Sequence, residues 1–183
     1  KIMSTTLRIA NPHEVYISGI VHDIGIIIIY QHFREAWRII NSLVCKKNVS
    51  RLAAEREVFS VDHGYIGAAL LENWNIPKSI TEGVKFHHSP GESELFKNNT
   101  IITYLGNEFS ERIDFDKDFN DFDYFLDKHK DFIDCMGDRG GRFTPSDEVI
   151  FFEKIYTLLH GVPGYLQGTM EGEKEIHDTC SCC

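Results

Sequence analysis

The fold prediction rests on one stretch, Glu57–Pro90, which reads EVFSVDHGYIGAALLENWNIPKSITEGVKFHHSP. A helical pattern of apolar residues begins at His63 and is interrupted at Trp74-Asn-Ile-Pro77. A second helical pattern follows and ends at His87-His88, because Pro90 disfavours helical backbone in the residue before it. The stretch therefore predicts two short helices, with a histidine at the start of the first and two histidines at the end of the second.

A second doublet, His22-Asp23, lies upstream, where another helical pattern stops. We interpret Gly25, two residues later, as the C-terminal stop of that helix. Neighbouring residues on a helix diverge by about 100° and cannot hold one ion beside its barrel, but they can converge where the last turn ends. The negative C-terminal end of a helix also favours a cation. The two doublets and His63 therefore predict a metal pocket.

The five predicted ligands are His22, Asp23, His63, His87 and His88. Imidazoles with a carboxylate suit iron, manganese, zinc or nickel, whereas calcium and magnesium prefer all-oxygen sites. The site could hold one ion or two, and a dinuclear site would use Asp23 as the bridging ligand. The sequence leaves open whether an ion is bound at all, because histidines of a former site can remain as hydrogen-bonded residues.

Helical spacing also governs the rest of the chain. The stretch from Ile26 to Val44 predicts one helix of about five turns, and the apolar residues from Ile101 to Ile113 predict another. A helix is also expected between Thr144 and Gly161, from its N-cap, proline and C-terminal glycine signals. Alternating apolar runs bounded by hairpin turns are missing from the sequence, so strands are not expected. The predicted fold class is all-α.

Composition limits the classes of partner. The chain has 183 residues, 42% of them hydrophobic, and a net charge of −9, with lysines and arginines scattered along it. This balance argues against general affinity for nucleic acid or for an anionic membrane surface. The longest apolar run, Ile24–Tyr30, is too short to span a bilayer. We expect a soluble protein, and a homo-oligomer is left open.

The five cysteines do not suggest a secreted disulfide framework. Their number is odd, and Cys45 and Cys135 lie in helical patterns far from the three at the C-terminus. No signal peptide is recognised at the N-terminus, although the chain starts at Lys1. We therefore expect reduced cysteines and a cytoplasmic location.

The motifs described above resemble those of the HDOD family, the HD-related output domains of bacterial signalling proteins. The resemblance is carried by Glu57–Pro77, by Phe86-His-His-Ser-Pro90 and by Gly19-Ile-Val-His-Asp-Ile-Gly25, and it covers roughly residues 14 to 113. It implies the all-helical fold of the HD superfamily, whose enzymatic members are metal-dependent phosphohydrolases, among them phosphodiesterases of cyclic dinucleotides.

The resemblance also implies roles for single residues. His22 and Asp23 correspond to the HD pair, and His63, His87 and His88 to the additional histidines that bind a second metal. Two positions depart from the pattern. An upstream histidine would precede Lys1, and the late aspartate of the family aligns with Asn107. A neutral amide neither balances metal charge nor acts as a base as a carboxylate does.

Two functions are compatible with these residues. The first is a regulatory output module of a signalling protein that binds a partner protein or a small phosphorylated ligand in a degenerate HD-type cleft. The second is an active phosphohydrolase, in which metal-bound water attacks a phosphoryl group, Asp23 serves the metal centre and Lys85 contacts the phosphate. Lys85 can equally be a solvated lysine.

We predict one domain over residues 1–183, with residues 114–183 as a helical C-terminal extension. The acidic stretch Asp114–Asp123 is interpreted as a solvated loop, because it lacks the glycine and the closing glutamate of a calcium-binding loop. The tail, His177-x-x-Cys180-x-Cys-Cys183, is interpreted as a reduced or disordered terminus rather than as a zinc or lipidation site.

Overall fold

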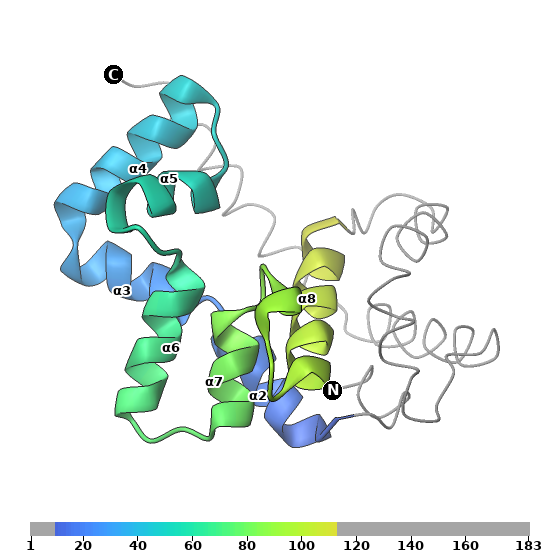
Figure 1. The fold of residues 1–183 in the computed structure, drawn as a ribbon. Coiled ribbons are helices and arrows are strands. Elements are labelled where there is room, and N and C mark those ends of the chain that lie inside the picture. Colours follow the sequence, from blue (N-terminus) through green and yellow to red (C-terminus); the bar gives the residue numbers. More distant parts are fainter. Residues whose placement is uncertain (1–9, 113–183) are drawn as a thin grey trace, which may run out of the picture. The chain divides into compact units, whose positions relative to one another are not determined.

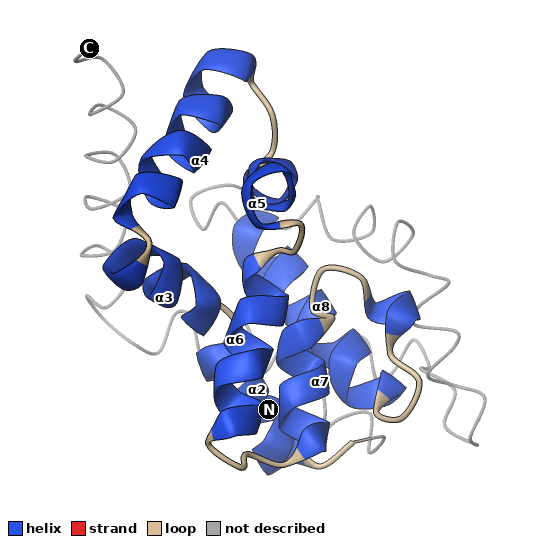
Figure 2. Ribbon diagram, turned by 60° about the vertical axis from the view of Figure 1, so that its left-hand side comes forward, coloured by secondary structure: helices blue, strands red, loops and turns tan. Residues whose placement is uncertain are grey.

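The computed structural model describes residues 10–112, and every regular element in this part of the chain is a helix (Figures 1 and 2). The elements are α2 (Pro12–Val21), α3 (Ile24–His32), α4 (Arg34–Lys47), α5 (Arg51–Phe59), α6 (His63–Asn73), α7 (Lys78–Lys85), the short 3-10 helix η1 (Pro90–Glu92) and α8 (Lys97–Arg112). No strand occurs between residues 10 and 112. The all-α prediction is confirmed.

The long helix predicted from Ile26 to Val44 is in fact two helices, and this prediction was wrong. Phe33 ends α3 and precedes α4, with φ −125° and ψ 54°, outside the helical region. Its ring contacts the ring of Phe59 edge-on, with centroids 5.5 Å apart. Tyr30 and Trp37 make a similar contact across the break, at 5.4 Å. Aromatic packing therefore holds the chain at a bend that contains neither glycine nor proline.

The described helices form two neighbouring groups. Helix α7 packs against α2, α6 and α8, and α2 also packs against α8. Helix α4 packs against α3 and α5, and α3 in turn packs against α6 (Figure 1). The second group surrounds a core of Ile29, Ile40, Leu43 and Ala54. Helices α3 and α6 therefore join the two groups, and the segment before α3 carries His22-Asp23.

Gly25 lies inside the first turn of α3 and does not stop α2, contrary to the prediction from sequence. A Cβ atom at Gly25 would collide with the backbone carbonyl of His63. The glycine is therefore explained by the close approach of α3 to the start of α6. Helix α2 ends at Val21 as predicted, so His22-Asp23 forms the short connection between two helices.

The helix ends predicted around Glu57–Pro90 are confirmed. Helix α6 starts at His63, and Asp62 caps it by accepting hydrogen bonds from the backbone N–H groups of Gly64 and Tyr65. Helix α7 follows Pro77 and ends at Lys85, just before His87-His88. These caps place three histidines at helix ends that face one another.

The stretch Pro12–His32 is long and apolar enough, by length and composition alone, to be a candidate membrane span. It consists of α2 and α3, separated at His22-Asp23, and both helices pack against other helices of the domain. Such a candidate is weak support for a membrane location, because helices of soluble proteins pass the same test. The expectation that the protein does not enter a membrane stays a prediction.

The chain divides into two compact units, residues 1–144 and 145–183, and the described residues all belong to the first. The predicted C-terminal extension, the acidic loop, the helix after Thr144 and the cysteine-containing tail lie outside the described residues. Among the described residues, Cys45 on α4 is disulfide-bonded, which does not agree with the expectation of reduced cysteines.

Candidate metal centre

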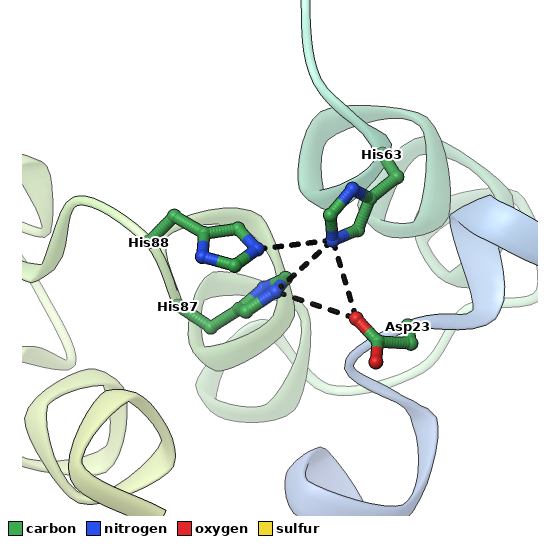
Figure 3. Close-up of side chains that lie close together, drawn as sticks. All are labelled: Asp23, His63, His87 and His88. Atoms are coloured by element: carbon green, nitrogen blue, oxygen red, sulfur yellow. Dashed lines mark hydrogen bonds and ion pairs between the residues drawn. The ribbon is translucent and has the colours of Figure 1, made fainter. Parts of the chain in front are cut away.

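Four of the five predicted ligands meet in one place. Asp23 lies between α2 and α3, His63 is the first residue of α6, and His87 and His88 follow α7 (Figure 3). One ligand atom from each of the four lies within 4.8 Å of the others. His63 and His87 are buried, whereas Asp23 and His88 are partly exposed. Three separate segments of the chain therefore build one pocket that opens to solvent beside Asp23.

The histidines point their Nε2 atoms at a common point. Nε2 of His63 lies 3.0 Å from Nε2 of His88 and 3.3 Å from Nε2 of His87. Oδ1 of Asp23 lies 3.2 Å from Nε2 of His63 and 3.6 Å from Nε2 of His87. Four donors placed about 2.1 Å from a zinc ion at the corners of a tetrahedron would be about 3.4 Å apart. These four separations are close to that value, and no separation in the set exceeds 4.8 Å.

Hydrogen bonds behind the rings fix which nitrogen is available. Nδ1 of His87 donates to the backbone carbonyl of Val84 at 2.6 Å. Nδ1 of His63 donates to a carboxylate oxygen of Glu55 at 2.7 Å. With both Nδ1 atoms protonated, the neutral rings present Nε2 lone pairs toward each other, an arrangement that repels unless a cation lies between them. The pocket therefore suits a metal ion or a proton at its centre.

The pKa shifts of His63, His88 and Asp23 favour a proton on His63. Burial lowers the pKa of His63, but its hydrogen bonds to Asp23 and Glu55 outweigh burial and raise the pKa to about 9. Burial and the neighbouring rings of His87 and His63 lower the pKa of His88 to about 3. Burial raises the pKa of Asp23, but its bonds to His22, His63 and His87 hold that pKa far below its ordinary value. A proton on His63 thus takes the position that a metal ion would fill.

His22, the fifth predicted ligand, faces a different set of atoms. Its Nδ1 donates to the backbone carbonyl of Gly19 at 2.8 Å. Its Nε2 lies 3.1 Å from Oδ2 of Asp23 and 3.2 Å from Oδ1 of Asn107. Burial lowers the pKa of His22, but the hydrogen bond and the charge of Asp23 raise it above its ordinary value. Asn107, which the sequence aligned with the family's late aspartate, is buried on α8.

The two oxygens of Asp23 therefore serve two groups. We call Asp23 Oδ1 with His63, His87 and His88 the histidine half of the centre, and Asp23 Oδ2 with His22 and Asn107 the amide half. A bridging role for Asp23, expected of a dinuclear site, is compatible with this placement.

Sequence reasoning did not find Glu55, although it contacts a predicted ligand. Glu55 lies on α5 and is fully buried. Glu55 lies four residues after Arg51 and three before Val58, so all three share one face of the helix, and both neighbours are half-buried. This spacing was the sequence signal that could have indicated a buried glutamate.

Lys85, predicted to contact phosphate, lies on α7. Its amine is placed over the rings of Tyr65 and Phe86, 4.9 and 5.0 Å from their centroids. It does not belong to the four-residue cluster.

Comparison with known proteins is consistent with the fold and the motifs. The family model of the HDOD domain matches residues 1–90. This match supports the resemblance to the HDOD family that the sequence motifs indicated. An HDOD domain protein of unknown function from Geobacter sulfurreducens has a crystal structure that superposes on 86% of this chain with a TM-score of 0.68, at 20% identity. That likeness supports the fold alone.

An uncharacterized protein of Treponema pallidum (strain Nichols) is 28% identical to this chain over 85 residues. Those residues are 46% of this chain and 17% of that protein. The chain likewise spans 54% of the Geobacter sulfurreducens structure. This chain is therefore comparable to part of each relative.

Proposed function

We propose that this domain is a regulatory output module of a signalling protein. In this proposal, the histidine half of the centre binds one divalent transition-metal ion, and the cleft binds a partner protein or a small phosphorylated ligand rather than catalysing efficiently. The observation that carries the proposal is the convergence of three Nε2 atoms and Asp23 Oδ1 on one point.

The amide half supports the regulatory part of the proposal. A dinuclear hydrolase needs carboxylates to balance the charge of two dications, and Asn107 supplies a neutral oxygen where a carboxylate is expected. His22 is instead held between acceptors that favour its protonated form. The contacts of the amide half thus stabilise a proton on His22, whereas the histidine half offers four donor atoms to an ion.

Metal analysis and an activity assay test this proposal together. Protein purified without chelator should contain about one equivalent of iron, manganese, zinc or nickel. Asp23→Asn should lose that metal, because the replacement removes the charged oxygen shared by both halves. Phosphodiesterase activity toward nucleotides and cyclic dinucleotides with added manganese or iron should stay near background. A metal-free native protein would contradict the proposed metal site.

Active phosphohydrolysis is the second candidate, and the placement of the two Asp23 oxygens favours it. A bound metal would supply hydroxide by lowering the pKa of water and would polarise a phosphoryl oxygen. Asp23 would hold the ion, and Lys85, whose amine lies over the rings of Tyr65 and Phe86, would contact the phosphate. Turnover that is lost in Asp23→Asn would support this candidate, and turnover unchanged by that replacement would exclude it.

A further inference from the structure

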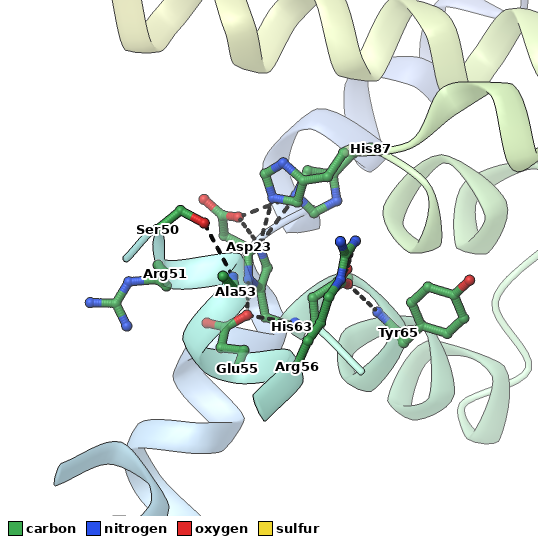
Figure 4. A network of polar contacts seen from close by, with 12 residues as sticks. Asp23, Ser50, Arg51, Ala53, Glu55, Arg56, His63, Tyr65 and His87 are labelled. Carbon is green, nitrogen blue, oxygen red and sulfur yellow. Dashed lines mark hydrogen bonds and ion pairs between the residues drawn. The ribbon is translucent and has the colours of Figure 1, made fainter. Parts of the chain in front are cut away.

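Glu55 is a buried carboxylate aimed at the back of a predicted ligand (Figure 4). Its Oε2 accepts two hydrogen bonds from His63, one from the backbone N–H at 2.9 Å and one from Nδ1 at 2.7 Å. Its other oxygen, Oε1, has no hydrogen-bond partner in the part of the chain that the structure describes. Both hydrogen bonds that the Glu55 carboxylate accepts from the described residues therefore come from His63.

These bonds determine what His63 offers to the pocket. A proton held on Nδ1 leaves Nε2 as the nitrogen that faces His87, His88 and Asp23. Because the same carboxylate oxygen also accepts from the backbone N–H of His63, it fixes both the imidazole ring and the start of α6. Carboxylates behind metal-bound histidines act in this way, and losing such a partner typically weakens metal affinity about 10- to 100-fold.

The charge of Glu55 is a second contribution. Three neutral imidazoles and Asp23 carry one negative charge, so a bound dication would leave a net charge of +1. Glu55 supplies a further negative charge one imidazole away, in a place with no exposure to solvent. A buried carboxylate is costly unless a cation compensates it. A divalent ion on Nε2 and the carboxylate on Nδ1 therefore stabilise each other.

We infer that Glu55 is a positioning residue of the metal centre, which holds His63 with Nε2 toward the ion and compensates the ion's charge. The inference rests on the proposed metal site. It also connects α5, and with it the α4–α5 pair, to that site, because Glu55 reaches His63 from the middle of α5.

Metal titration of Glu55→Gln provides the test. Glutamine keeps an oxygen that can accept from both His63 N–H groups but removes the charge. Glu57→Gln is the matched control, because Glu57 lies on the same helix, carries the same charge and is exposed beside Lys47. Zinc or manganese should bind Glu55→Gln about 10- to 100-fold more weakly than wild type. Glu57→Gln should bind like wild type, and thermal unfolding of the chelated proteins should show that all three are folded.

The outcomes separate the two proposals. Equal affinity in all three proteins would overturn the role of Glu55 and leave the metal site standing. Absence of binding in both wild type and Glu57→Gln would overturn the metal site and the role of Glu55 with it. Nitrogen NMR of the wild type gives a readout that needs no variant. His63 should keep its proton on Nδ1 when zinc is added, while Nε2 shifts, and coordination through Nδ1 would overturn the inference.

Discussion

The two halves of the centre share Asp23 but differ in what surrounds it. In the histidine half, Oδ1 meets three imidazoles whose Nε2 atoms point inward. In the amide half, Oδ2 meets one imidazole and the amide of Asn107. The first half offers four metal donors, and the second offers three, of which one is a neutral amide. The two halves therefore differ in the charge that they offer to an ion, although they share one carboxylate.

The difference is chemical rather than positional. Asn107 lies within 3.2 Å of His22, where a carboxylate at the same position could share in binding an ion. An amide instead leaves Asp23 as the one charged partner of His22 among residues 10–112. A centre with one ion and a neutral amide would lack the two-ion clamp of dinuclear phosphohydrolases.

The largest expected effect is a difference in zinc affinity between alanine variants of His88 and His22. Both side chains are partly buried, and each belongs to one doublet, so alanine replacements of the two are closely matched. His88→Ala removes a metal donor, and zinc affinity should fall more than about 100-fold, beyond the loss expected for a ligand's hydrogen-bond partner. His22→Ala removes only a partner of Asp23, and affinity should fall at most about tenfold. Calorimetric zinc titration measures both.

Equal losses in the two variants would mean that the halves act as one site. Thermal unfolding of the two variants in chelator is the control. Both should stay folded, because neither replacement removes much of the buried apolar core. A larger loss in His22→Ala than in His88→Ala would reverse the comparison.

A smaller effect is expected from restoring charge to the amide half. Asn107→Asp places a carboxylate beside His22 and Asp23 Oδ2, and Asn107 is buried in contact with His22 already, so no large movement is needed. We expect a second equivalent of manganese or iron to bind, more weakly than the first. Metal content after dialysis against each ion measures this, and thermal unfolding of the variant in chelator shows that it is folded.

If Asn107→Asp binds two ions and gains phosphodiesterase activity over wild type, the amide is what keeps this centre from dinuclear chemistry. If the variant still binds a single ion, the limitation lies elsewhere in the pocket, and the charge argument for the amide half is wrong.

The sequence predicted the fold better than it predicted the residues that contact the proposed metal ligands, such as Glu55. Helix ends around Glu57–Pro90 followed from proline and from the spacing of apolar residues, which are local signals. Asn107, which the sequence aligned with the family's late aspartate, lies beside His22 in the structure. The break at Phe33 could not be foreseen, because it depends on packing against Phe59 rather than on local backbone preference.

Glu55 and Gly25 show why the remaining features were missed or misread. Each is explained by a contact with His63, a residue distant in sequence or on another helix. Glycine near a helix end usually indicates a stop, and here a close helix contact requires it instead. A glutamate on a short helix is usually solvated, and here tertiary structure buries it.

The smallest effect concerns the metal-free protein. With chelator present, the folded protein holds a proton on His63 more tightly than the unfolded chain does, because Asp23 and Glu55 raise the pKa of His63 to about 9. The stabilisation is fully present below the unfolded pKa of about 6.5 and is lost as the pH rises through about 9. The melting temperature of chelated protein should therefore fall by several degrees, on the order of the shift that 1 kcal/mol produces, between pH 6.5 and 9.

The same experiment distinguishes the halves when zinc is added. A metal ion replaces the proton at the histidine half, so the alkaline loss of stability should disappear at saturating zinc. In chelator, the melting temperature of His63→Gln should change little between pH 6.5 and 9, since glutamine does not titrate. His88→Ala should still lose stability over this range, because the pKa of His88 is lowered to about 3 and its ring stays neutral throughout. An unchanged pH profile in His63→Gln would place the proton on another group, and the assignment of the charge to the histidine half would then be wrong.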